Sequence, residues 1–131
     1  MISELSSVTS NLVSATLDAS MLRHKIISNN IANNNVEGFK ALDVNFESLL
    51  RAELSEKIGS TNSNRLEEVL NYLSPEINER KGDNMVGPTE KTLDQEMAEM
   101  AKNTLKYESL IKAQSLQSGI LNMAITGSRN R

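Results

Sequence analysis

The residues that could do chemistry in this chain are few and poorly spaced for it. The sequence holds one histidine, His24, and no cysteine, so a zinc site would need carboxylates alone, which is improbable. A serine nucleophile would have to recruit His24 from within a long helical pattern, and the glycines stand singly rather than in a phosphate-binding loop. Glu67 and Glu68 are neighbouring carboxylates, but adjacent residues of a helix point apart. We therefore predict no enzyme, no metal site and no cofactor.

Charge and composition exclude further classes. The net charge is −3 and the basic residues are scattered, whereas a nucleic-acid binder needs clustered Lys and Arg. No stretch approaches the roughly 18 apolar residues of a membrane span, and the N-terminus has no secretory-signal pattern, so we expect neither insertion nor cleavage. With two Phe, two Tyr and no Trp, the core is thin. Neighbouring subunits could complete it; the alternative is a plain small helical domain.

The elements that remain to be explained are two apolar stripes, one near each end of the chain. A spacing of three and four residues places such side chains on one side of a helix, which needs a partner to cover it. We predict an all-α fold in which long N- and C-terminal helices pair as an antiparallel coiled-coil-like hairpin around an irregular middle segment. The helix-packing residues are Leu5, Val8, Leu12, Ala15, Ala19, Leu22 and Ile26 in the first stripe, and Leu93, Met97, Met100, Tyr107, Ile111, Leu121 and Ile125 in the second.

The first helix is expected over residues 3–30 or slightly beyond, and an asparagine-rich run at 29–35 would end it. Gly38 then supplies a turn position that favours glycine. The sequence predicts an extended segment at 41–46 and a short helix at 46–54. Beyond these we expect a loop at 58–64, two helical turns at 65–73 and turns within 81–88.

The second helix is expected to open at Thr92, whose hydroxyl pairs with Gln95 as a capping box, and to end at Gly127. Glu96, Glu99 and Glu108 are interpreted as its solvated face. Polar or small residues interrupt its stripe. We interpret them as allowing close helix approach and fixing register, the alternative being a partly solvated face; they are Thr104, Gln114, Ser118 and Gly119.

The turn after the first helix resembles the signature of the flagellar basal-body rod proteins, which reads like N-I-A-N-x-x-T-P-G-[YF]-[KQR]-A. Val36 and Glu37 replace its Thr-Pro, and residues 91–97 resemble the family's N-T-V-D-x-x-x-E-M segment, with Lys91 in place of Asn. The short length and the run at 22–30 are most similar to proximal-rod subunits. The matching residues of the turn are Asn30, Ile31, Ala32, Asn33, Gly38, Phe39, Lys40 and Ala41.

The resemblance implies a structural subunit of the basal-body rod whose terminal helices form an inner tube around an export channel. Residues 1–35 and 92–127 would be the two halves of this tube domain, and 36–91 the turn and middle region. Expected partners are other rod subunits, further copies of the chain, the basal adaptor protein and the flagellar type III export apparatus, with neither nucleic acid nor membrane insertion.

Two alternatives stay open. Phe46 and Leu50 are similar to a pattern proposed for export-gate docking, but they could equally pack together at positions i and i+4. The chain as a whole could instead be a soluble helical binding module, such as a secretion chaperone or adaptor that grips a partner's helix.

Overall fold

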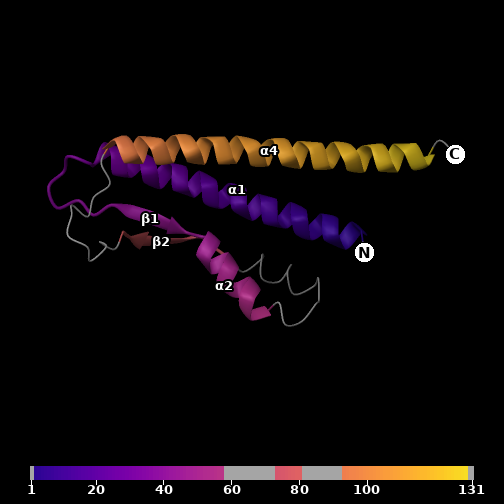
Figure 1. Cartoon of the computed structure of the whole chain (residues 1–131), viewed down its shortest axis with the longest axis horizontal. Coiled ribbons are helices and arrows are strands. Elements are labelled where there is room, and N and C mark those ends of the chain that lie inside the picture. The colour runs from indigo at the N-terminus through magenta and orange to yellow at the C-terminus, as the bar shows by residue number, and fades with distance from the viewer. Residues whose placement is uncertain (1, 58–72, 81–92, 130–131) are drawn as a thin grey trace.

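Two long helices dominate the computed structural model, which describes residues 2–57, 73–80 and 93–129. The two helices pack against each other and run antiparallel, so both chain ends lie at the same end of the molecule (Figure 1). The predicted fold is therefore confirmed, with one addition, a two-stranded sheet in the middle segment. In chain order the elements are α1 (Ile2–Ala32), β1 (Leu42–Asn45), α2 (Glu47–Lys57), β2 (Glu76–Glu79) and α4 (Leu93–Arg129).

The long helices differ in how closely they approach along their length. At a rise of about 1.5 Å per residue, the 31 residues of α1 and the 37 of α4 span about 46 and 55 Å. They lie close where α1 ends and α4 begins, and they diverge toward their free ends (Figure 1). We call residues 19–32 and 93–110 the closed end of the pair, and residues 6–18 and 111–127 its open end.

The small sheet packs against α1 through β1. Strands β1 and β2 are antiparallel, with Val44 opposite Ile77, and β1 is the strand that contacts α1. Val44 and Phe46 are buried, at 6% and 1% exposure, while all of β2 faces solvent. The expectation of an extended segment at 41–46 followed by a short helix is confirmed, whereas β2 was not predicted.

The turn between α1 and β1 depends on Gly38. Its φ of +76° lies in the left-handed region, which side chains with a Cβ adopt at a cost of about 1–2 kcal/mol. An added Cβ would meet nothing within 4 Å. The turn therefore requires glycine for its backbone conformation and not for space, as the sequence predicts.

Other boundaries depart from expectation or cannot be compared. Helix α4 continues through Gly127 to Arg129, so the predicted stop at Gly127 is wrong; glycine is costly but permitted within a helix. Leu73 lies outside any helix. The rest of the helix predicted at 65–73, the loop at 58–64, the turns within 81–88 and the Thr92 cap fall outside the described residues. None of the described helices combines the length and apolarity that crossing a bilayer requires.

Candidate assembly surface

Asn30 attaches β1 to the end of α1. Its side-chain amide donates to the carbonyl of Leu42 at 2.9 Å, and its amide oxygen accepts from the Leu42 N–H at 3.0 Å. The residue is only 3% exposed. A buried amide that satisfies both backbone groups of one strand residue fixes the strand's position along the helix. This geometry explains why the turn needs an asparagine at this place.

The other residues of the predicted turn motif act locally. The Asn33 amide donates back to the Asn29 carbonyl at 2.8 Å, which satisfies a helix-end acceptor. Lys40 pairs with Glu79 of β2 at 3.0 Å in an exposed position, and the Ala41 carbonyl accepts from the Arg80 N–H at 2.8 Å. Ile31 and Phe39 are half-buried and Ala32 is exposed. The structure thus gathers this motif into one turn that carries the sheet.

A buried polar pair crosses between the long helices at the closed end. The Ser20 hydroxyl donates to Asn103 Oδ1 at 2.8 Å, and Asn103 Nδ2 donates to the Ser20 carbonyl at 2.9 Å. Both residues are buried, at 0% and 5% exposure. Such a pair forms in one alignment of the helices only, and polar groups at helix seams set register in this way. The sequence interpretation assigned this role to Thr104, Gln114, Ser118 and Gly119 and missed Asn103.

A second buried contact joins the sheet to the first turn of α4. Arg80 Nη1 lies 2.6 Å from Glu96 Oε1, and the two side chains are 14% and 2% exposed. Among the described residues, Arg80 Nε and Glu96 Oε2 have no hydrogen-bond partner. The interpretation of Glu96 as solvated is wrong, because its side chain is buried and pairs with Arg80, the residue that follows β2.

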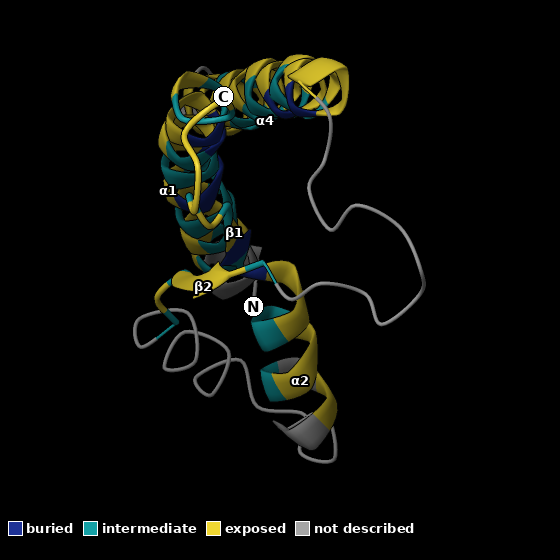
Figure 2. Ribbon diagram, turned by 90° about the vertical axis from the view of Figure 1, so that its left-hand side faces the viewer, coloured by how far each residue is buried: buried dark blue, intermediate teal, exposed yellow. Residues whose placement is uncertain are grey.

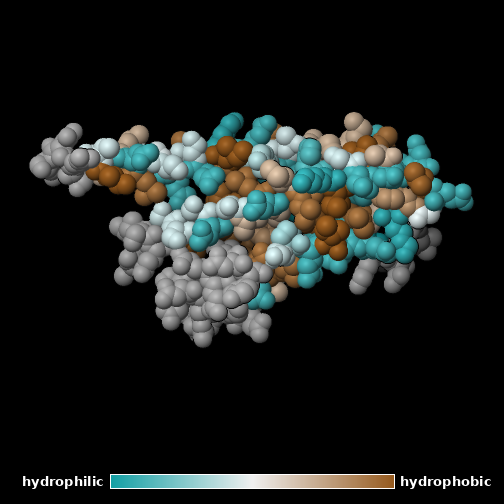
Figure 3. Space-filling view, turned by 180° about the vertical axis from the view of Figure 1, so that it is seen from behind, coloured by the Kyte–Doolittle hydropathy of each residue, from teal (hydrophilic) through white to brown (hydrophobic). Residues whose placement is uncertain are grey.

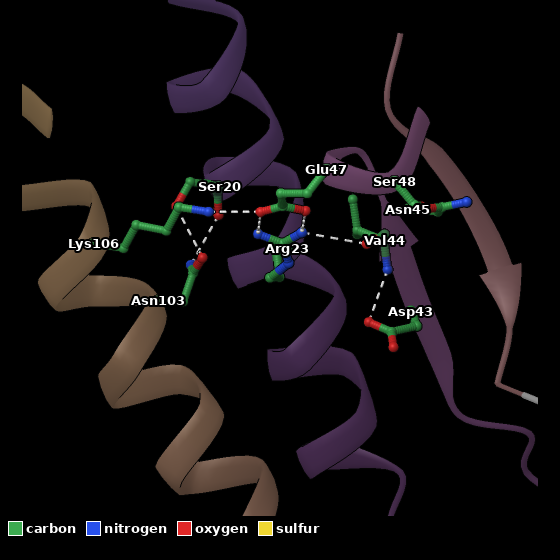
Figure 4. A network of polar contacts seen from close by, with 9 residues as sticks. All are labelled: Ser20, Arg23, Asp43, Val44, Asn45, Glu47, Ser48, Asn103 and Lys106. Carbon is green, nitrogen blue, oxygen red and sulfur yellow. Dashed lines mark hydrogen bonds and ion pairs between the residues drawn. The ribbon is translucent and has the colours of Figure 1, made fainter. Parts of the chain in front are cut away.

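Glu47 links three helices on the side of the pair that carries the sheet. Its carboxylate accepts hydrogen bonds from Arg23 of α1 at 2.5 and 3.0 Å and from Lys106 of α4 at 2.6 Å (Figure 4). Arg23 also donates to the Val44 carbonyl at 3.3 Å. Burial by itself raises the pKa of Glu47, but the hydrogen bonds from Arg23 and Lys106 outweigh it and lower the pKa from 4.5 to about 2. Glu47 therefore stays ionised and holds α2 against the pair.

Another part of the seam between α1 and α4 is hollow and mostly apolar. A depression of about 260 Å³ lies beside the Ser20–Asn103 pair. Met21, next to it, is 49% exposed, and Tyr107 is half-buried. No Asp, Glu, Lys or Arg lines it; its residues are Ser20, Met21, His24, Asn103, Thr104 and Tyr107. The charged residues around Glu47 and the residues that line this apolar hollow are thus different, except that Asn103 borders both.

The predicted stripe of α1 lies partly against other elements. Ala19 is buried, and five further members are half-buried: Val8, Leu12, Ala15, Leu22 and Ile26. The side chain of Leu5 falls outside what the structure describes. The structure therefore places this stripe on a side of α1 that is covered most completely at the closed end.

The predicted stripe of α4 is largely uncovered. Met100 and Tyr107 are half-buried, but five members are between 37% and 66% exposed: Leu93, Met97, Ile111, Leu121 and Ile125. The positions of α4 that are buried are instead Glu96 and Asn103, seven residues apart. The side of α4 that packs in the chain thus overlaps its apolar stripe only in part, and much of that stripe is left at the surface.

Apolar exposure is greatest at the open end. Leu116, Ile120 and Met123 are 69%, 66% and 73% exposed, and none of the described side chains at this end is buried. Figure 2 shows the buried residues gathered where α1, α4 and β1 face one another, and Figure 3 shows hydrophobic patches reaching the surface of the helical pair. An apolar surface of this kind is typical of a subunit that is completed by neighbours.

The possible export-gate residues belong to the interior of the folded chain. Phe46 is 1% exposed and Leu50 is half-buried, and the Leu50 N–H donates to the Phe46 carbonyl at 2.8 Å. In this state Phe46 is a core residue that anchors the start of α2. Across the described parts of the chain, no three His, Asp or Glu side chains converge as metal ligands would.

Comparison with known proteins agrees with the motif in the turn. A family described as "Flagella basal body rod protein" matches residues 14–40, the stretch that contains the Asn30 amide, the turn and Gly38. The flagellar basal body rod protein FlgB of Bacillus subtilis (strain 168) is 27% identical over 119 residues. That match covers 82% of this chain and 85% of the relative.

Proposed function

Because residues 14–40 match the flagellar basal-body rod proteins and the chain is similar to FlgB over most of its length, we propose that it is a rod protein that polymerises through its terminal helices into the proximal rod. In this role the chain would be a structural protein of the basal body and would assemble with other rod components. In the proposed polymer the paired helices form the wall of a hollow shaft that transmits torque and encloses an export channel.

The observation that carries this proposal is the exposure of large apolar side chains along α4. Leu116, Ile120 and Met123 are all more than 60% exposed, which is unfavourable for a helix that stays in water. Burying such side chains between copies supplies a driving force for polymerisation that the isolated chain lacks. This role needs no catalytic site, and the residues proposed to carry it are spread along both helices: Leu5, Val8, Leu12, Ala15, Ala19, Leu22, Ile26, Leu93, Met97, Met100, Tyr107, Ile111, Leu121 and Ile125.

Export and the more distant partners belong to the same proposal. The chain would contact the adaptor protein beneath the rod as well as other rod subunits, and it would reach the rod through the flagellar export apparatus. Phe46 and Leu50 would be read at the export gate only before folding, since Phe46 is enclosed in the folded chain. Folding at the growing tip would then bury the export signal.

Localisation of the chain in purified basal bodies tests the proposal against a secretion chaperone or adaptor. A rod subunit is expected to co-purify with detergent-extracted basal bodies, and cells lacking it should make no rod and should not swim. A chaperone would stay in the cytoplasm, bound to its client, and would be absent from the purified structures. Recovery of the chain only with a soluble client would overturn the proposal.

A further inference from the structure

Helix α4 carries an uncovered continuation of the face that packs on α1. Leu121 and Ile125 lie 18 residues, or about five turns, after Asn103 and Tyr107, so each pair shares one face of the helix. Asn103 is buried against Ser20, yet Leu121 and Ile125 are 37% and 66% exposed. They are uncovered because α1 has diverged from α4 at this end (Figure 1).

Helix α1 shows the same pattern on another face. Val8 and Leu12 lie 18 residues before Ile26 and Asn30, and Asn30 is the residue that holds β1. At the closed end β1 covers this face of α1. The sheet does not extend to the open end, where Val8 and Leu12 remain half-exposed.

Both uncovered segments are free of charge on every side. Charged residues make up 24% of the chain, but none falls within residues 5–17 or 113–127. Charge is depleted at the cores of protein interfaces and retained at solvated surfaces. An uncharged surface on each helix also gives no basis for recognition by a charged partner, so the occupant must be apolar and uncharged as well.

We propose that these two faces cover each other between copies of the chain. In this arrangement, which rests on the proposed rod function, Val8 and Leu12 of one copy pack on Leu121 and Ile125 of the next. The two patches differ, so the contact is heterologous and propagates from copy to copy, as a rod requires, instead of closing into a symmetric dimer. A helix that is apolar on several sides, as α4 is at Leu116, Leu121 and Ile125, is typical of one surrounded by other helices.

The absence of native cysteine allows a direct test by disulfide cross-linking. Two chains of different size, made distinct by a tag, are produced together in cells, one carrying Leu12→Cys and the other Leu121→Cys. Basal bodies are then isolated and mildly oxidised. We expect the mixed cross-linked dimer in about tenfold excess over that from a Ser115→Cys control, because a disulfide requires Cα atoms within about 7 Å. Ser115 is exposed at the same end of α4, about 120° around the helix from Leu121.

A second pair, Val8→Cys with Ile125→Cys, repeats the test where either leucine variant fails to assemble. Mixed dimers from one of the two pairs support the proposal. Chains that enter basal bodies but yield no mixed dimer, or only dimers of like chains, overturn this contact and leave the rod function standing. If neither the cysteine variants nor the cysteine-free chain appears in basal bodies, the rod function and the contact are overturned together.

Discussion

The two ends of the helical pair are built on different principles. The closed end has buried polar contacts with defined partners: Ser20 with Asn103, Asn30 with Leu42, and Arg80 with Glu96. The open end has no buried side chain among those described and no charged residue within 5–17 or 113–127. Directional contacts specify one arrangement within the chain, whereas an uncharged apolar surface gains its stability only when something covers it. One end thus defines the subunit, and the other is left to be completed by assembly.

The largest effect on the isolated chain is expected from Arg80→Leu at the closed end. Glu96 would keep a buried carboxylate, at 2% exposure, without its cation, and breaking a buried pair costs about 3–5 kcal/mol. Urea unfolding followed by circular dichroism measures the loss. Lys40→Leu is the matched control, because it breaks an ion pair to the same sheet whose side chains are 72% and 62% exposed; there we expect about 0–1 kcal/mol. Equal losses would show that the buried Arg80–Glu96 pair stabilises the closed end no more than an exposed pair does.

Asn30→Ala should have the next largest effect. It leaves the N–H and the carbonyl of Leu42 without their partner, which costs about 2–3 kcal/mol for buried groups. The sheet should also loosen from α1, which hydrogen exchange at Val44 and Ile77 would detect. Asn33→Ala serves as the comparison, since the Asn33 side chain bonds to Asn29 within the same helix end and not to the strand. If the two variants unfold alike, Asn30 does not act by holding the strand.

A smaller effect is expected from the titration of Glu47. Its pKa is lowered to about 2 in the folded chain, so its ion pairs contribute fully above about pH 4.5 and their contribution is lost as the pH falls through about 2. Because the side chain is 47% exposed, solvent screening limits the effect to about 1 kcal/mol. Unfolding free energies measured at intervals between pH 2 and 5 should fall more steeply for the native chain than for Glu47→Gln. Parallel curves would show that the Arg23 and Lys106 contacts add nothing to stability.

The smallest effect on the isolated chain, and the sharpest contrast between the ends, is expected from Ile120→Ser. Ile120 is 66% exposed, so unfolding should change by less than about 0.5 kcal/mol, while incorporation into basal bodies and swimming should be lost. Leu105→Ser changes an equally exposed residue, also 66%, within the closed end, and it should leave assembly intact. A Leu105→Ser variant that fails as completely as Ile120→Ser would remove the distinction between the two ends.

The features predictable from the sequence were those that depend on local pattern. The stripes that contain Leu12 and Tyr107 predict two long helices, and Gly38 predicts a left-handed turn, because both follow from the geometry of a few neighbouring residues. The resemblance of the turn to the rod family pointed to the same end of α1. Local pattern was therefore sufficient for the architecture, and the family match at residues 14–40 covers most of the same turn.

The contacts that fix the closed end could not be predicted from local sequence pattern. Strand β2 has the sequence Glu-Ile-Asn-Glu, with little intrinsic strand preference, and it forms by pairing with β1. Glu96 is buried in a pair with Arg80, which directly follows that strand and lies 16 residues before it in the sequence. Asn103 could have been found, since it lies one heptad after Glu96 and opposite a small residue. The apolar residues Met100 and Tyr107 were predicted as the packing positions of this part of α4 instead.

The pairing of Ser20 with Asn103 also has a consequence for the order of folding. These partners are 83 residues apart, so the closed end cannot form until most of the chain is present. Contacts between distant segments slow folding, because the intervening chain must be closed into a loop before they stabilise anything. A chain delivered to its destination from the first residue onward would therefore hold α1 unpaired until α4 arrived, and the arrival of residue 103 would set the earliest moment at which the subunit takes its final shape.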